Sequence, residues 1–89
     1  MAEIVFTNGK KKIVRPKNGT DFQLEEMQKI VGGYIETLRI GGDRIMVVNE
    51  EGKLKDLEVN EEATHIARCN GYADIIVGDV LICDDDQIL

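Results

Sequence analysis

Residues 24–40, LEEMQKIVGGYIETLRI, decide the fold because a helical pattern meets a strand pattern within them. Apolar residues in the first half recur three or four positions apart and so share one helix face: Leu24, Met27, Ile30 and Val31. Apolar and polar residues then alternate from residue 34, as in a strand. Between the halves, Gly32-Gly33 supplies the left-handed conformation that commonly ends a helix. The stretch predicts an amphipathic helix that turns directly into a strand.

The start of this helix and the two faces of this strand follow from the same stretch. Thr20 is expected to cap the helix, and Gln23, three residues later, completes a capping box. Alternation places Tyr34, Glu36, Leu38 and Ile40 on one face of the strand and Ile35, Thr37 and Arg39 on the other.

Residues 3–15 before the helix have the pattern of a β-hairpin. Asn8-Gly9 favours a type I′ turn, because both residues tolerate positive φ. With that turn, Ile4 lies opposite Ile13 and Phe6 opposite Lys11, and Ile4, Phe6 and Ile13 face the core. Arg15-Pro16 ends the second strand, since proline has no amide for the ladder.

After residue 40 the pattern predicts four further features. Residues 45–49 are expected to form a strand buried on both faces, and residues 53–57 to return beside it after a turn. Asn60 is a plausible cap for a short helix at residues 61–68. Residues 74–83 contain two apolar runs divided by Gly78-Asp79, which indicates a hairpin or a strand bent at the glycine.

These elements predict one α+β domain spanning residues 1–89. The order strand, strand, helix, strand, strand is that of a β-grasp, in which a small mixed sheet packs on one main helix. A short second helix and the C-terminal hairpin or bent strand complete the expected fold.

Charge is spread unevenly over the chain. The net charge is −6, but Lys10, Lys11, Lys12, Arg15 and Lys17 against Glu3 give residues 1–17 a charge of +4, so the remainder carries −10. An acidic surface disfavours general nucleic-acid binding. The hairpin lysines, Lys10 to Lys12 above all, are suited to a small phosphorylated ligand or an acidic partner, or they form a solvated edge.

Several classes of protein and site are disfavoured. Cys69 and Cys83 stand apart from each other, and His65 has no paired ligand spacing, so neither a metal site nor a disulfide framework is expected. No apolar run is long enough to span a membrane and no signal peptide is recognisable, which predicts a cytoplasmic protein without a membrane partner. No catalytic motif or cofactor motif occurs, so we expect a protein that is not an enzyme and uses no cofactor.

Four segments resemble a family of small bacterial domains of unknown function: LEEMQKIVGGYIE at 24–36, VVNEEGKL at 47–54, Asn60, and IVGDVLI at 76–82. That family is found largely in phages, plasmids and integrative elements. The resemblance implies an accessory protein of a mobile element that acts on a host component.

Five polar residues are the candidate ligand-binding site: Tyr34, Glu36, Asn49, Lys53 and Asn60. Asn and Lys can satisfy hydroxyls and phosphates and Tyr offers a stacking face, although turn and cap roles explain Asn49 and Asn60 equally well. If these groups converge within one chain or across a homo-oligomer interface, we expect sequestration of a small, nucleotide-like host ligand. The alternatives are an acidic inhibitor that binds a host enzyme and an assembly module that pairs through an edge strand.

Overall fold

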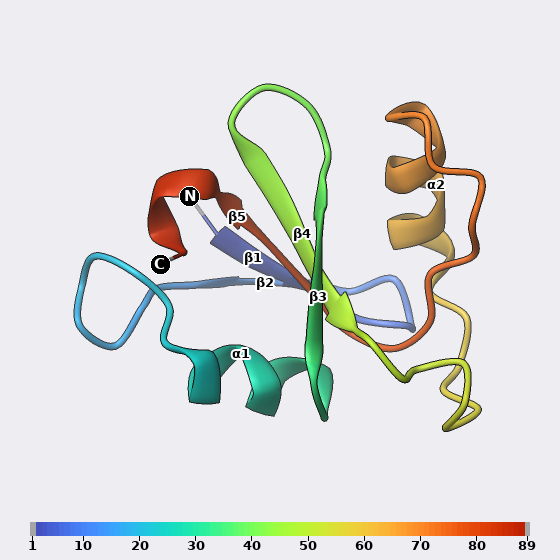
Figure 1. Ribbon diagram of the computed structural model, residues 1–89, viewed down its shortest axis with the longest axis horizontal. Helices are drawn as coiled ribbons and strands as arrows, with labels where there is room; N and C mark the ends of the chain where they lie inside the picture. Colours follow the sequence, from blue (N-terminus) through green and yellow to red (C-terminus); the bar gives the residue numbers. More distant parts are fainter. Residues whose placement is uncertain (1, 89) are drawn as a thin grey trace.

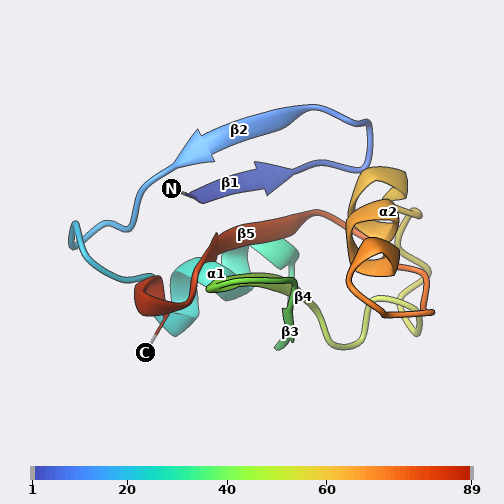
Figure 2. The same ribbon diagram turned by 90° about the horizontal axis from the view of Figure 1, so that it is seen from above.

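The computed structural model describes residues 2–88, which form one sheet and two α-helices (Figures 1 and 2). The sheet order is β2-β1-β5-β4-β3, and every neighbouring pair of strands is antiparallel. The elements are β1 (Ala2–Val5), β2 (Lys11–Val14), α1 (Leu24–Val31), β3 (Ile35–Arg39), β4 (Arg44–Asn49), α2 (Glu61–Cys69), β5 (Val80–Asp84) and the 3-10 turn η1 (Asp85–Gln87). The predicted α+β class and element order are confirmed.

The prediction of a mixed sheet is wrong. The residues between β4 and β5, which include α2, return the chain so that β5 runs opposite to both β4 and β1. No parallel pair of strands therefore exists in the described sheet.

The two helices cover opposite faces of the sheet. Met27 and Val31 of α1 pack with residues that include Val47, Leu81 and Cys83, whereas Ala63 and Ala67 of α2 pack with Met46, Val48, Val80 and Ile82. Neighbouring residues of β4 and β5 thus point to different helices, as alternation along a strand requires. This arrangement confirms that residues 45–49 form a strand buried on both faces.

The last strand lies at the centre of the sheet. Val80, Leu81, Ile82 and Cys83 are at most 1 % exposed. The chain turns at Gly78, where φ is 81°, and β5 begins only at Val80, so residues 74–83 do not form one strand bent at the glycine. The preceding residues add only one isolated bridge, between Val59 and Val77, so the described chain has no C-terminal hairpin.

Helix α1 ends as predicted but begins later. Gly32 has φ 83° and its N–H donates to the carbonyl of Gln28, which confirms the glycine stop. The N-cap is Gln23, whose side chain makes no cap hydrogen bond, so the prediction of a Thr20 cap is wrong. The Thr20 hydroxyl instead lies 2.8 Å from Asp21 Oδ1, in the turn that leads into the helix. Leu24 at the first helical position is 51 % exposed, outside the buried part of the stripe.

The N-terminal hairpin forms with a different register. Among residues 2–88 only Asp56 has positive φ without being glycine, so Asn8 does not adopt a type I′ conformation. The N–H of Gly9 donates to Phe6 O, and the loop is one residue longer than predicted. Ile4 therefore faces Lys12, and Ile13 faces Glu3. A one-residue slip moves each side chain of a strand to the other face, which explains why Ile13 is 64 % exposed.

The expected strand at residues 53–57 is also wrong. Three hydrogen bonds close successive turns there, from Lys55 N to Glu51 O, from Asp56 N to Lys53 O and from Leu57 N to Gly52 O. The short helix that follows is confirmed, because the Asn60 side chain accepts from Ala63 N at the start of α2. None of the helices in residues 2–88 has the length and apolar character needed to cross a bilayer.

Burial of Cys83 predicts a pH dependence of stability. Desolvation, followed by the nearby Asp84 carboxylate, raises the pKa of the Cys83 thiol to about 11. An unfolded chain loses this proton nearer pH 9, so the free energy of unfolding should fall by about 2 kcal/mol between pH 9 and pH 11. Urea titrations across this range measure the slope. Cys83→Ala should lose this contribution and Cys69→Ala, at an exposed position, should keep it; equal slopes in both variants would contradict the assignment.

Candidate functional site

A groove of about 370 Å³ lies between the end of the β3–β4 pair and the segment that follows α2. We call it the β3–β4 groove. Its lining comes from β3 and β4, from the turns after β4 and from residues 72–77: Glu36, Leu38, Val48, Asn49, Glu50, Lys53, Leu54, Tyr72, Asp74, Ile75, Ile76 and Val77. Two parts of the chain that are distant in sequence, residues 36–54 and 72–77, thus line one groove.

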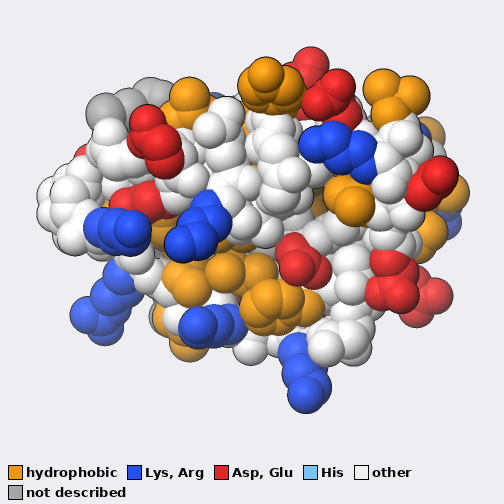
Figure 3. Space-filling model, turned by 90° about the horizontal axis from the view of Figure 1, so that it is seen from below, with side chains coloured by type: hydrophobic (Ala, Val, Ile, Leu, Met, Phe, Trp, Pro, Cys, Tyr) orange, Lys and Arg blue, Asp and Glu red, His pale blue; other side chains and the backbone are white. Residues whose placement is uncertain are grey.

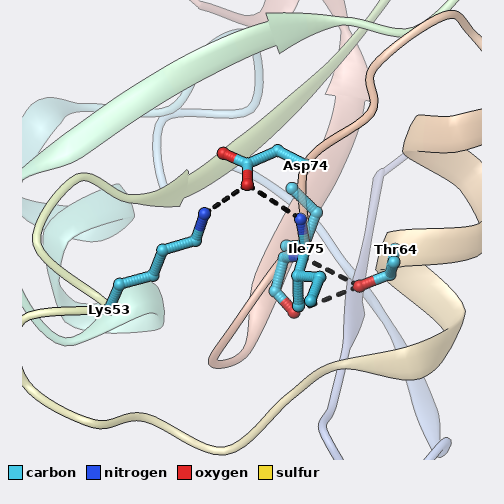
Figure 4. Close-up of polar contacts among 5 residues, drawn as sticks. Lys53, Thr64, Asp74 and Ile75 are labelled. Carbon is cyan, nitrogen blue, oxygen red and sulfur yellow. Dashed lines mark hydrogen bonds and ion pairs between the residues drawn. The ribbon is translucent and has the colours of Figure 1, made fainter.

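The wall formed by residues 72–77 is fastened to α2. Ile76 N–H donates to the Thr64 hydroxyl oxygen over 2.9 Å, and that hydroxyl donates back to Ile76 O over 3.2 Å. The backbone N–H of Asn60 also donates to Ile76 O. Ile76 and Thr64 are buried. The wall is therefore held in place although it contains no regular secondary structure (Figure 4).

An ion pair joins two residues of the groove lining, Lys53 and Asp74. Figure 4 shows the Lys53 side chain extended from its turn toward the Asp74 carboxylate, which also accepts from Ile75 N–H over 3.0 Å. These contacts, that of Lys53 first, hold the pKa of the Asp74 carboxyl below its usual value. Both side chains are exposed, so the pair can open at little cost to stability.

The charges around the groove are mainly negative. Glu36, Glu50 and Asp74 contribute three carboxylates against the single ammonium of Lys53, which gives −2 among the lining residues. The apolar part of the lining contains one aromatic ring, and its buried or half-buried members are Leu38, Val48, Tyr72 and Ile76, whereas Leu54 and Ile75 are exposed. The lining thus combines apolar side chains with carboxylates.

The structure brings together three of the five residues predicted to bind a ligand. Glu36, Asn49 and Lys53 all line the β3–β4 groove. Tyr34 does not: it is 64 % exposed and lines a separate depression with Gln28, Lys29, Gly33 and Lys55. Asn60 is fully buried and lies outside the groove lining.

Both asparagines use their side chains inside the protein. Asn49 Nδ2 donates to Val31 O over 3.0 Å, and its Oδ1 accepts from Glu51 N over 2.8 Å, which joins the end of α1 to the turn after β4. Asn60 Nδ2 donates to both Val5 O and Gly78 O over 2.9 Å, while its Oδ1 caps α2. The turn and cap interpretation therefore explains both residues.

Sequence reasoning missed the wall of the groove. Tyr72, Asp74, Ile75 and Ile76 follow the Asn70-Gly71 break, where we expected the beginning of a terminal hairpin or strand. The break itself indicates an irregular segment, but no local sequence pattern predicts that this segment lies beside β4. Hydrogen bonds to Thr64 and Asn60 make that placement.

The one histidine of the chain lies away from the groove. His65 is on the exposed side of α2, with Nε2 3.7 Å from the sulfur of Cys69, and is not among the residues lining the groove. Within residues 2–88, no three His, Cys, Asp or Glu side chains are grouped so that they could hold a metal ion.

A protein-family model described as "Domain of unknown function (DUF3846)" matches residues 2–88 of the chain. The predicted resemblance to a family of small domains of unknown function is thereby confirmed. The association of that family with phages and plasmids stays a prediction. No curated protein and no solved structure matches the chain.

Proposed function

We propose that this chain, which belongs to the DUF3846 family of domains of unknown function, is a non-enzymatic binding domain that holds a small ligand in the β3–β4 groove. The main support is the lining of that groove, where apolar side chains and a tyrosine ring lie with three carboxylates and one lysine. Pockets of a few hundred Å³ with an apolar lining and a few polar groups are typical of small-molecule sites.

The charges narrow the class of ligand. The sequence favoured a nucleotide-like molecule, with Lys53 as a phosphate contact. Lys53 is paired with Asp74, and a phosphate bound there would have to displace one carboxylate and approach Glu36 and Glu50. A cationic group would instead be attracted by all three carboxylates. We therefore propose a ligand with an aromatic or apolar part on the Tyr72 side and an amine at the margin.

Lys53→Met distinguishes a cationic ligand from an anionic one. The substitution removes the Lys53 ammonium group, which leaves the Asp74 carboxylate free to bind an incoming amine. Affinity for tyramine should therefore rise by about threefold. Affinity for AMP should instead fall if Lys53 contacts its phosphate. Titrations of ¹⁵N-labelled protein followed by NMR measure both affinities and locate the shifted amides.

The neutral compound N-acetyltyramine keeps the ring of tyramine but lacks its positive charge, so it isolates the contribution of the ring to binding. It should bind more weakly than tyramine. Glu36→Gln should weaken tyramine binding, whereas the matched change Glu58→Gln, at an exposed residue outside the groove lining, should not. Tyramine binding that is lost in Lys53→Met, or amide shifts confined to other surfaces, would refute the proposed ligand class.

The proposed biological role follows from the predicted association of the family with phages and mobile elements. A binding domain without turnover would act by sequestering a host compound, as expected of an accessory protein of a phage or mobile element. The position of His65 supports the non-enzymatic part, because the one imidazole of the chain lies outside the groove. Native mass spectrometry of protein purified from its own host tests the setting: a compound released only on denaturation would support sequestration.

A further inference from the structure

A second groove, of about 420 Å³, lies on the opposite side of the sheet from α2, between strands β1 and β2 and helix α1. We call it the β2–α1 groove. Its floor is apolar and continuous with the core on the α1 side: Ile4, Val14, Phe22 and Ile30. Figure 3 views the molecule from the α1 side and shows an apolar patch bordered by Lys and Arg side chains.

The groove exists because α1 is too narrow for the sheet. Helix α1 packs mainly on β3, β4 and β5, so it leaves part of this face of β1 and β2 uncovered. Five strands spaced by about 4.8 Å make a sheet face about 20 Å wide, whereas a helix with its side chains is about 10 Å across. The uncovered part of the face has the width of one further helix.

The charge of the rim is opposite to that of the protein. Arg15, Lys17 and Lys29 line the groove, and the register of the hairpin places Lys12 on the same face as Ile4. Two carboxylates, Glu25 and Glu26, face them, and Glu26 accepts from the backbone N–H of Lys17 over 3.2 Å. Three cations against two anions give the lining a net charge of +1, although the whole chain is −6.

We propose that the β2–α1 groove docks an amphipathic helix of a partner protein, with acidic residues on both sides of its apolar stripe. The apolar stripe would cover Ile4, Val14 and Ile30, and its carboxylates would reach Arg15, Lys17 and Lys29. Helices that dock in this way bind through apolar residues at helical spacing. A nucleic acid suits the groove less well, because contacts to its phosphates would leave the apolar floor of Ile4, Val14 and Ile30 uncovered.

A designed helical peptide tests the proposal directly. The probe is a peptide of about 18 residues with Leu at positions i, i+3, i+4 and i+7 and Glu on the flanks. The controls are the same peptide with Lys in place of Glu and a scrambled peptide that keeps the composition but loses the apolar stripe. Fluorescence anisotropy at low and high salt should show binding of the acidic amphipathic peptide alone, and weaker binding at high salt.

Single variants locate the site. Arg15→Glu should weaken binding of the acidic peptide about tenfold, and Val14→Thr should weaken it several-fold because the floor becomes more polar. Arg68→Glu makes the same change of charge on α2, which covers the other face, and should leave affinity within about twofold. Equal losses in Arg15→Glu and Arg68→Glu would show a general charge effect and overturn the proposal.

Two further results would overturn it. One is equal binding of the acidic, basic and scrambled peptides, which would show unspecific adhesion to the apolar floor. The other is an absence of peptide binding while a single-stranded oligonucleotide binds and loses affinity in Arg15→Glu. Melting curves of each variant confirm that the protein compared is folded.

Discussion

Asn60→Ala is expected to lower the free energy of unfolding by about 3–5 kcal/mol, because one buried side chain serves three backbone groups. Its Nδ2 donates to the carbonyls of Val5 and Gly78, and its Oδ1 accepts from the N–H of Ala63. The substitution removes these three hydrogen bonds from a fully buried position. Urea unfolding followed by circular dichroism measures the loss.

Two variants separate this role from simple helix capping. Asn60→Asp keeps an acceptor for Ala63 N–H but sets carboxylate oxygens against two carbonyls, so we expect no rescue. Asn70→Ala removes one hydrogen bond, from Nδ2 to Ile66 O at the exposed end of α2, and should cost less than about 1 kcal/mol. If the Asn60→Asp variant were as stable as the native protein, the two hydrogen bonds from Asn60 Nδ2 to Val5 O and Gly78 O would contribute little to stability.

Leu81→Ala is the second large effect, with an expected loss of about 3–5 kcal/mol. Leu81 is fully buried on the central strand β5 and packs with Met27 and Val31 of α1 and with Val47 of β4. Removing its branched end leaves a cavity that helix and sheet cannot both close. The same urea titrations measure the effect.

The matched control for Leu81 is Leu54→Ala. Leu54 is 85 % exposed, so its truncation should change stability by less than about 0.5 kcal/mol. Similar losses for the two variants would contradict the assignment of β5 to the centre of the core. Leu54 also lines the β3–β4 groove, so the same variant reports whether ligand binding needs an apolar contact there.

The candidate site was predictable only in part. Glu36, Asn49 and Lys53 were predicted as ligand contacts from residue type and all three line the β3–β4 groove, although Asn49 uses its polar atoms inside the protein. Tyr72 and Asp74 were missed, because their placement depends on hydrogen bonds between Ile76 and Thr64, twelve residues apart. Residue type indicates which side chains can bind a ligand. It does not indicate which of them already form hydrogen bonds to backbone carbonyls or amides within the protein.

The sequence alone determined the local elements: the α1 helix with its Gly32 stop, the alternation along β3, the buried β4 and the Asn60 cap of α2. Each depends on periodicity or on a backbone conformation encoded within a few residues. Tertiary structure decided the rest. The hairpin register depended on which of two loop lengths fitted the sheet, and the central place of β5 depended on pairing with β1 and β4. The β3–β4 groove lies between residues 36–54 and 72–77, and the β2–α1 groove depends on where α1 packs on the sheet, so no local pattern could encode either of them.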